Sequence, residues 1–137
     1  MKVSKEYKWE MGHRLMFYMG KCNNLHGHSY KVKVELNGIP DTNGMVLDFF
    51  IIDSIMGKII DVLDHSFIVY KEDKKLIRLL NELDFKHVVF DTECTAENIV
   101  IYFLQEIKNT GLPQNIKSVK VSVYETEDAY AEDEIIL

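Results

Sequence analysis

The residue types best suited to chemistry are concentrated in one short segment, Cys22-Asn23-Asn24-Leu25-His26-Gly27-His28. Residues at positions i and i+2 of a β-strand point to the same side, so the two histidines of this segment would project together and can share one metal ion. His13, on a neighbouring segment, offers a third imidazole. Three histidines leave one position of a tetrahedral zinc ion open, which is typical of catalytic rather than structural zinc sites.

The alternative is that His26-Gly27-His28 is a solvent-exposed strand end, and a His-x-His pair taken alone favours that simpler interpretation. The residues that follow change the balance. Tyr30 to Leu36 alternate apolar and charged side chains, the pattern of a half-buried strand, and the same register places both histidines on the apolar face. A buried histidine needs a polar partner or a metal. The sequence therefore favours a metal site.

Two further groups near this segment have alternative interpretations. Cys22 stands four residues before His26. A thiol close to a metal or a base can act as a base or nucleophile, whereas the commoner role of a free cysteine is to fill space in a core. Asp64-His65 is either a carboxylate that orients a proton-transferring imidazole, or a helix end with a favourably placed histidine. From the residues alone, both pairs of alternatives stay open.

Glu125 continues the inward-facing register of Val119, Val121 and Val123. A carboxylate buried without a partner costs on the order of several kcal/mol, so Glu125 lies at the exposed end of its strand or binds a ligand. A ligand edge with two N–H donors, like that of a guanidine, would satisfy it in a bidentate contact. For Cys94, just before a predicted helix, we expect a packing role.

The elements that must position these residues follow the order strands, helices, strands. Strand patterns cover Tyr30 to Leu36 and Val119 to Tyr124, and the region around Val3, Tyr7 and Trp9 is a weaker candidate for a partner strand. Helical spacing runs from Asp48, a good N-cap, to Leu63-Asp64-His65. This order predicts an α+β protein with an antiparallel sheet covered on one face.

Shorter segments complete the expected order. Glu72 to Leu83 is amphipathic, and Lys86 to Phe90 resembles a short strand. Thr95 caps a second long helix, which Gly111-Leu112-Pro113 ends. The tail Glu134-Ile135-Ile136-Leu137 is expected to form a final edge strand, and His87 is expected at the surface.

Length and charge limit the classes of function. The chain has 137 residues, which predicts one domain over 1–137. Its 16 basic and 22 acidic residues give a net charge of −6, which argues against a general nucleic-acid binder. No apolar run is long enough for a membrane helix, and MKVSKEYKWE lacks the apolar core of a signal peptide. Two cysteines are too few for a disulfide scaffold, so we expect a cytoplasmic protein without a membrane partner.

Taken together, the chemical residues resemble one family. Their order and spacing are similar to those of the 6-pyruvoyl-tetrahydropterin synthase family, which includes the bacterial 6-carboxy-tetrahydropterin synthases of the queuosine pathway. The matching segments are His13, Cys22, His26-Gly27-His28, Gly44-Met45-Val46-Leu47-Asp48-Phe49, Leu63-Asp64-His65, Thr95-Ala96-Glu97-Asn98 and Tyr124-Glu125-Thr126. Each segment alone is a weak signal, but the joint match from His13 to Thr126 is specific.

The resemblance implies a fold, an assembly and a substrate. The fold would be the tunnelling fold (T-fold), an antiparallel four-stranded sheet with two long helices on one face. Three subunits would join their sheets into a barrel, and two trimers would stack into a homohexamer with active sites between subunits. The substrate would be 7,8-dihydroneopterin triphosphate.

The resemblance also assigns the metal and the base. His13, His26 and His28 would hold a zinc ion (Zn²⁺), which binds oxygens of the substrate's side chain and acts as a Lewis acid. Cys22 would be the base that abstracts a proton. The retained cysteine argues against family members that replace it with glutamate and cleave the side chain to a hydroxymethyl product.

The remaining roles concern proton transfer and the pterin ring. Asp64 and His65 would form the acid–base partner of the thiol. Glu125 would bind the amino-pyrimidine edge of the ring, which agrees with the two-donor contact argued above. Thr95 and Ala96, at a helix N-terminus, would line the pterin pocket.

Two departures from the family pattern affect the expected pocket wall. Cys94 stands where the family usually has a proline, and Trp9-Glu10-Met11-Gly12 replaces a phenylalanine and small residues before the first histidine. Neither departure removes an expected metal ligand or the expected base.

Three functions are compatible with this site. One removes triphosphate and isomerises the side chain to pyruvoyl; another also expels acetaldehyde and leaves a carboxylate. The third is a zinc-stabilised pterin-binding module without turnover, against which Cys22 and Asp64-His65 argue. The short acidic segment after Thr126 resembles the bacterial queuosine enzymes, so the sequence favours the carboxy product.

Overall fold

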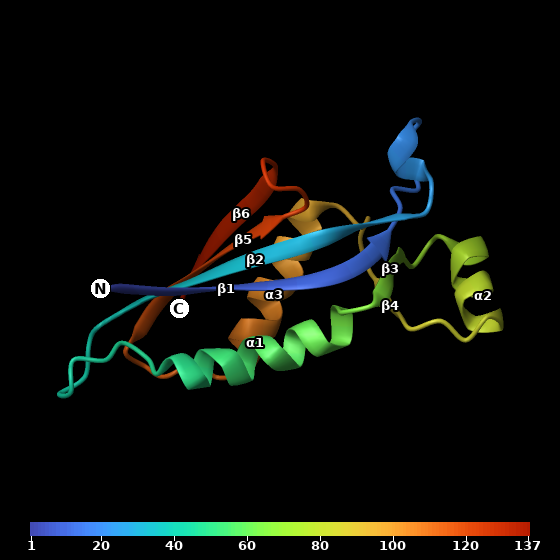
Figure 1. The fold of residues 1–137 in the computed structure, drawn as a ribbon. Helices are drawn as coiled ribbons and strands as arrows, with labels where there is room; N and C mark the ends of the chain where they lie inside the picture. The colour runs from blue at the N-terminus through green and yellow to red at the C-terminus, as the bar shows by residue number, and fades with distance from the viewer.

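The computed structural model describes residues 1–137, and its elements follow the expected order with two additions, the short 3-10 helix η1 and the short strand β3 (Figure 1). The nearly continuous apolar run of β3 lacks the period-2 alternation that identifies a half-buried strand. The elements are β1 (Lys2–His13), η1 (Lys21–Asn23), β2 (His26–Gly38), α1 (Phe49–Leu63), β3 (Ser66–Tyr70), α2 (Lys74–Glu82), β4 (His87–Phe90), α3 (Ala96–Asn109), β5 (Ile116–Tyr124) and β6 (Tyr130–Ile136).

The sheet has six strands, in the order β4-β3-β1-β2-β5-β6. The expected antiparallel four-stranded sheet is present as β1, β2, β5 and β6. The expected count of four strands for the whole sheet is wrong, because β3 and β4 extend it beyond β1. Both additions pair in parallel, β3 with β1 and β4 with β3. Parallel neighbours need a crossover connection, and α2 supplies it between β3 and β4.

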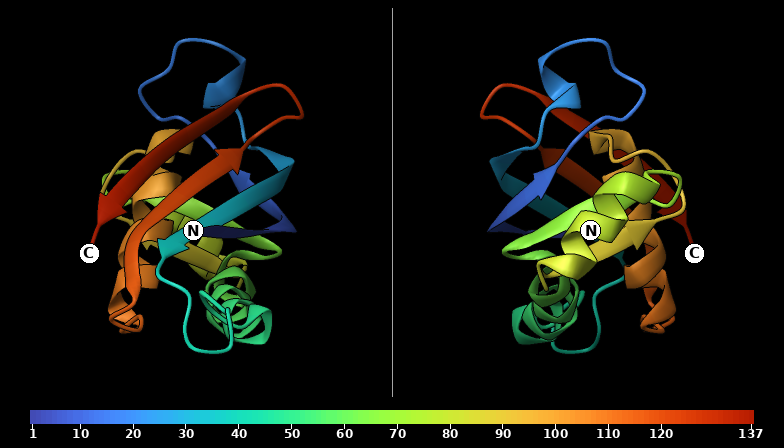
Figure 2. Two further views of the ribbon diagram at one scale, coloured as in Figure 1. Left: turned by 90° about the vertical axis from the view of Figure 1, so that its left-hand side faces the viewer. Right: turned by 90° about the vertical axis from the view of Figure 1, so that its right-hand side faces the viewer.

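The two long helices, α1 and α3, lie on the same face of the sheet, as the sequence predicts (Figures 1 and 2). Both start where their caps were expected. The carboxylate of Asp48 accepts a hydrogen bond from the Phe50 amide at 2.9 Å, and the Thr95 hydroxyl accepts one from the Asn98 amide at 3.3 Å. No helix of the structure combines the length and the apolar content needed to cross a membrane.

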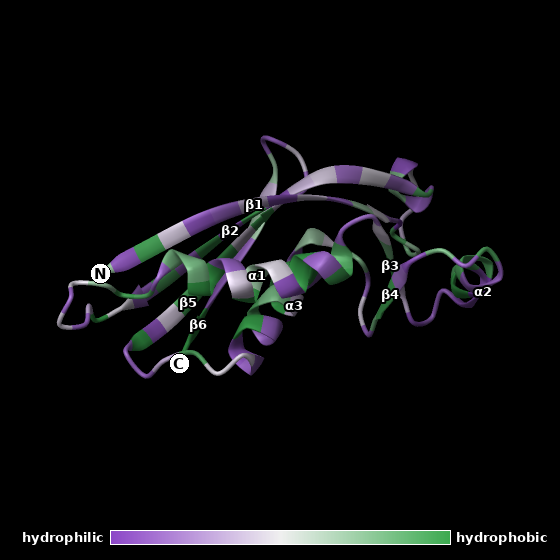
Figure 3. Ribbon diagram, turned by 60° about the horizontal axis from the view of Figure 1, so that its bottom comes forward, coloured by the Kyte–Doolittle hydropathy of each residue, from purple (hydrophilic) through white to green (hydrophobic).

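The core lies between these helices and the inner face of the sheet. Trp9 stacks on Tyr30 with ring centroids 5.1 Å apart, and Phe103 of α3 packs against Trp9 at 5.4 Å. Every second residue of β2 and β5 contributes to this core, which produces the hydrophilic and hydrophobic bands visible along the strands in Figure 3. The opposite face of the sheet bears charged side chains. The inner face is thus the one that places His26 and His28 next to buried residues.

A small second cluster joins α2 to the end of the sheet where β1 terminates. Val69, Leu76 and Leu80 form its apolar part. Arg14, the residue after β1, makes a bidentate ion pair with Asp73, with Nε–Oδ2 at 2.6 Å and Nη2–Oδ1 at 2.8 Å. The Asp73 side chain is only 4% exposed, and it also accepts the Leu76 amide as the N-cap of α2. Arg14 therefore fixes both the start of α2 and the chain that leaves β1.

Replacing Arg14 by alanine should leave the carboxylate of Asp73 buried without its counter-ion. We expect Arg14→Ala to lower the free energy of unfolding by about 2–4 kcal/mol, near the range for breaking a buried ion pair. The matched control is Lys71→Ala, which removes an exposed pair with Asp91 and should cost at most about 0.5 kcal/mol. Urea denaturation of both variants measures the difference. Equal stability of the two variants would show that the Arg14 pair does not hold this end of the sheet together.

Candidate active site

Three histidines converge because of the register between the two long antiparallel strands. In the β1–β2 ladder, His13 lies opposite His26, and Met11 lies opposite His28. One ring nitrogen from each of the three histidines falls in a group whose atoms all lie within 4.8 Å of one another. The ring centroids are 4.6 Å apart for His13–His26 and 5.0 Å for His26–His28. These residues can therefore hold one metal ion.

A pair of glycines permits this close approach of the two strands. Gly12 and Gly27 lie directly opposite each other, one position from the His13–His26 pair. A Cβ atom on Gly27 would lie 2.9 Å from the carbonyl oxygen of Met11, and one on Gly12 would overlap the ring of Phe67. Any side chain at either position would push a strand away. Gly27, between two histidines, therefore leaves room for the backbone of β1.

Backbone carbonyl groups orient two of the imidazoles. Nδ1 of His13 lies 2.7 Å from the carbonyl oxygen of Cys94, and Nδ1 of His26 lies 2.7 Å from that of Asn24. A carbonyl oxygen only accepts hydrogen bonds, so Nδ1 is the donor in both rings, and Nε2 is the nitrogen left to bind a metal ion. Carbonyl groups commonly hold metal-binding histidines in this way.

The third imidazole has an unsatisfied nitrogen. Nε2 of His28 is buried and has no hydrogen-bond partner; its 3.4 Å approach to Oε1 of Glu125 lacks hydrogen-bond geometry. Burial lowers the pKa of His28, so this ring is neutral near pH 7, the form that binds metal. An unsatisfied nitrogen grouped with ring nitrogens of His13 and His26 fits a metal ion with three nitrogen ligands.

Glu125 lies against this group, just beyond the end of β5. Its Oε1 atom is 3.1 Å from Nε2 of His13, and the hydroxyl of Tyr30 donates to the same oxygen at 3.4 Å. The close contact with Nε2 of His13 lowers the pKa of Glu125, so its carboxylate is ionised at neutral pH. The side chain is 30% exposed, which places it between the two sequence alternatives of a strand end and a ligand-binding position.

Asp64 and His65 form an oriented pair at the end of α1. Oδ2 of Asp64 lies 3.0 Å from Nδ1 of His65, and Oδ1 accepts the backbone N–H of Glu10 at 3.0 Å. The Glu10 amide, followed by His65, lowers the pKa of Asp64, which stays ionised. His65 has a φ of 55°, a left-handed conformation that is uncommon outside glycine, and its amide donates to the Glu10 carbonyl at 2.7 Å. The backbone of β1 thus holds both members of the pair.

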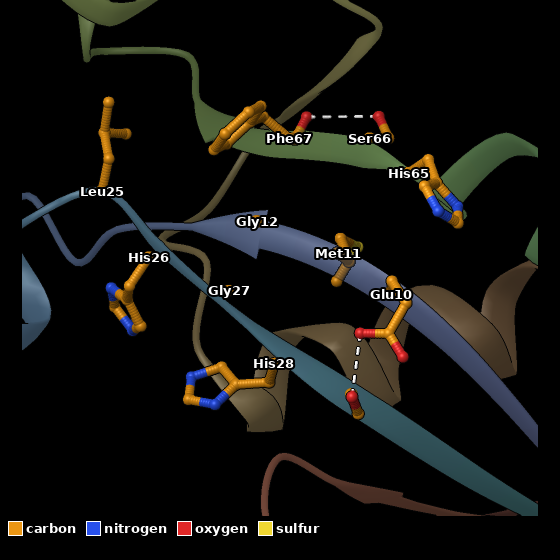
Figure 4. Close-up of a pocket in the computed structure, with 11 residues that line it drawn as sticks. Glu10, Met11, Gly12, Leu25, His26, Gly27, His28, His65, Ser66 and Phe67 are labelled. Atoms are coloured by element: carbon orange, nitrogen blue, oxygen red, sulfur yellow. Dashed lines mark hydrogen bonds between the residues drawn. The ribbon is translucent and has the colours of Figure 1, made fainter.

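Six of the predicted site residues line two hollows, whereas His13, Cys22 and Asp64 line neither. The histidine hollow, of about 490 Å³, is lined by Glu10, Met11, Gly12, Leu25, His26, Gly27, His28, Ser29, His65, Ser66 and Phe67 (Figure 4). The Glu125 hollow, of about 380 Å³, is lined by Leu15, Phe17, Tyr18, Thr95, Ala96, Glu97, Glu125, Ala129, Tyr130 and Ala131. The two meet at the histidine group, because His28 lines the first and approaches Glu125, which lines the second.

The two cysteines occupy different environments. Cys22 is half-buried in η1, within the connection from β1 to β2, and lines neither hollow. Cys94 is fully buried, and burial raises the pKa of its thiol to about 12. Such a thiol stays protonated and unreactive at neutral pH, in agreement with the packing role expected for it.

Sequence reasoning did not identify the partners that orient the site. Glu10 supplies both backbone contacts to the Asp64–His65 pair, and the Cys94 and Asn24 carbonyl groups fix two rings. Backbone groups are the same in nearly all residue types, so the sequence does not reveal which of them make these contacts. Phe17 and Tyr18 are exposed aromatic residues beside the Cys22 segment, and that pattern was the available signal for the wall of the Glu125 hollow.

Comparison with known proteins places the chain in a family. The profile described as "6-pyruvoyl tetrahydropterin synthase" matches residues 2–134. The 6-carboxy-5,6,7,8-tetrahydropterin synthase of Haemophilus influenzae is 33% identical, with 96% of each chain covered. A putative enzyme of the same name from Pyrococcus abyssi is 36% identical and covers 84% of this chain and 77% of its own.

Solved structures show the same fold. The 6-pyruvoyltetrahydropterin synthase of Plasmodium vivax, in a catalytic-residue mutant, superimposes with a TM-score of 0.81 at 20% identity, covering 100% of this chain and 98% of that one. The Caenorhabditis elegans 6-pyruvoyl tetrahydropterin synthase gives 0.72 at 25% identity, covering 98% and 95%. The expected T-fold is therefore confirmed. The chain belongs to the 6-pyruvoyl tetrahydropterin synthase family, and it is an enzyme, a lyase like the 6-carboxytetrahydropterin synthases that it resembles.

Proposed function

We propose that this protein converts 7,8-dihydroneopterin triphosphate and water to 6-carboxy-5,6,7,8-tetrahydropterin, acetaldehyde and triphosphate, as a step of queuosine biosynthesis. The observation that carries the proposal is the convergence of three imidazoles, two of them oriented through Nδ1 by backbone carbonyl groups, beside a hollow that His65 also lines. The names of the relatives support the choice of reaction.

We assign the metal site to His13, His26 and His28, with Zn²⁺ as the ion. Three neutral nitrogen ligands suit zinc and leave a coordination position for substrate. Bound there, zinc supplies Lewis-acid polarisation of the oxygens on the substrate's side chain. The protein's part is to hold the three rings in place through the carbonyl groups of Cys94 and Asn24.

The proton transfers fall to three residues of this chain. Cys22, as thiolate, takes a proton from a carbon of the substrate's side chain. His65, oriented by the carboxylate of Asp64 through the 3.0 Å contact, gives or takes the proton that balances this step. The imidazole of His65 is 78% exposed and lines the histidine hollow, so it is open to a substrate bound there.

The ring of the substrate belongs in the Glu125 hollow. The ionised carboxylate of Glu125 accepts the two N–H donors on the amino-pyrimidine edge of the pterin. Thr95 and Ala96 form the facing wall at the N-terminus of α3. A ring held there lies next to the histidine group, because Glu125 lies within 3.1–3.4 Å of His13 and His28.

We further propose that the chain is a single tetrahydropterin-synthase-like domain, 1–137, which assembles in the cytoplasm as a homohexamer with active sites between subunits. The sheet ends on two open edges, β4 and β6. Open edges are normally paired or covered, and pairing between copies satisfies their free backbone groups. Inter-subunit sites would bring further groups to hollows that are open in one chain.

Incubation with 7,8-dihydroneopterin triphosphate tests the reaction. We expect one acetaldehyde, trapped as a hydrazone, for each triphosphate released. Triphosphate release without acetaldehyde would instead identify a 6-pyruvoyl-tetrahydropterin synthase, the alternative that the family profile's description favours. Binding without release of either product would identify a non-catalytic pterin-binding module and overturn the proposal.

Metal content tests the three-histidine assignment. The purified protein should contain about one zinc ion per chain, and His28→Ala should lose it, since three protein ligands are the usual minimum for such a site. His87→Ala is the control, because His87 lies on the edge strand β4 with Nδ1 bonded to the Phe85 carbonyl. Elemental analysis gives the zinc per chain. Full retention of zinc in both His26→Ala and His28→Ala would contradict the assignment of the three histidines as zinc ligands.

Replacement of Cys22 separates a base from a space-filling residue. Loss of a positioned base typically lowers turnover by about 10²- to 10⁴-fold, so Cys22→Ala should retain zinc and pterin affinity but be nearly inactive. Cys22→Ser should be similarly impaired, because a hydroxyl of the same shape is a far weaker base. Turnover and thermal unfolding are measured on both variants. Near-normal turnover of Cys22→Ala, at any melting temperature, rules out the catalytic role.

A further inference from the structure

The Glu125 hollow has an aromatic rim for which the proposed reaction gives no role. Phe17 and Tyr18, from the connection between β1 and β2, are 61% and 48% exposed, and Tyr130, from the start of β6, is 54% exposed. The β1–β2 connection and the β5–β6 connection lie at the same end of the molecule (Figure 2). Large aromatic residues exposed together around a hollow are characteristic of a binding surface.

The two sides of this rim are held differently. Tyr130 stacks on Tyr124 at 4.7 Å, and Nζ of Lys31 lies 4.1 Å from the centroid of the Tyr124 ring, so this side is fixed to the sheet. The rings of Phe17 and Tyr18 are perpendicular, with centroids 6.3 Å apart, and belong to the connecting loop. A flat heterocycle with its polar edge at Glu125 would meet aromatic faces or edges on both sides, the arrangement that aromatic pairs prefer.

The same loop carries Cys22, and its two halves are bonded together. The Leu15 amide donates to the Cys22 carbonyl at 2.7 Å, and the side-chain amide of Asn23 donates to the Met16 carbonyl at 3.0 Å. The Tyr18 ring lies so close to Gly20 that a Cβ there would be 2.7 Å from it. The aromatic half therefore cannot move without moving the half that holds the thiol.

We propose that Phe17 and Tyr18 contact the flat face of the pterin ring, and that their loop couples ring binding to the placement of the Cys22 thiol. The inference rests on the proposed function for the identity of the ring, and goes beyond it by naming residues that select a flat ring. The base would be set in place only when the ring is bound, which restricts proton abstraction to the correct substrate. Asn23 is a positioning residue in this arrangement, because it links the two halves.

The experiment uses pterin, the bare bicyclic ring, which binds without a side chain to react. We expect Phe17→Ala and Tyr18→Ala each to weaken pterin binding about three- to tenfold, the range for loss of one aromatic contact. Met19→Ala is the matched control, since Met19 lies in the same loop, is fully exposed and lines neither hollow. Quenching of pterin fluorescence measures the affinity, and light scattering measures the assembly.

Alkylation of Cys22 by iodoacetamide, followed by mass spectrometry, reports on the coupling without any turnover. Saturating pterin should slow alkylation at least threefold in the wild type and in Met19→Ala. Asn23→Ala should keep its pterin affinity, lose the slowing and lower kcat more than it raises KM. The buried Cys94 should not react under these conditions.

Each contrary outcome overturns a specific part of the proposal. Unchanged pterin affinity in both Phe17→Ala and Tyr18→Ala would rule out the proposed contact with the pterin ring. A loss of assembly in these variants would also rule it out, because the two aromatic rings would then belong to a subunit interface. If pterin does not change the alkylation rate of Cys22 in the wild type, the proposed coupling is ruled out. A wild-type protein that binds no pterin contradicts the proposed function itself, so the two failures are distinguishable.

Discussion

The register of β1 against β2 is the constraint on which the rest of the site depends. It places His13 opposite His26, and it places His28 on the same face, two residues further along β2. A slip by one residue would turn the alternating side chains of β2 to the other face and separate the imidazoles. The Gly12–Gly27 pair belongs to the same requirement, because only glycines allow the backbone of β1 and the ring of Phe67 to lie so close. The apolar alternation of β2 maintains this register, since a slip would expose the core.

The polar atoms around the histidines form a nearly closed set of partners. The carbonyl groups of Cys94 and Asn24 accept hydrogen bonds from Nδ1 of His13 and His26. Tyr30 and His13 contact the carboxylate of Glu125. The remaining orphan is Nε2 of His28. Because an unsatisfied buried nitrogen is costly, this atom is the position where a bound ligand would stabilise the structure most. The proposed metal ion would supply the partner that Nε2 of His28 lacks.

Two segments distant in sequence are joined at the site by backbone contacts alone. The amide and the carbonyl of Glu10 hold Asp64 and His65, more than 50 residues later, so the end of α1 is fixed against β1. The left-handed conformation of His65 persists because these contacts determine it. On the other side, the hydrogen bonds of the 14–25 connection tie aromatic residues to Cys22. The geometry of the proposed acid–base groups therefore depends on elements that also carry the proposed binding surface.

The sequence by itself determined the strands and helices that have a clear period or cap, the α+β class, and the candidate residues for metal, base and ring. Periodicity works for β2, α1 and α3 because burial imposes it on residue type. It did not reveal β3, whose apolar run has no period, or the parallel extension of the sheet. Only the tertiary structure decided which ring nitrogens contact backbone carbonyl groups, that Glu125 faces the histidines, and that the site divides into two hollows. These depend on contacts between backbone atoms and between segments far apart in the chain, and residue types along one strand do not record them.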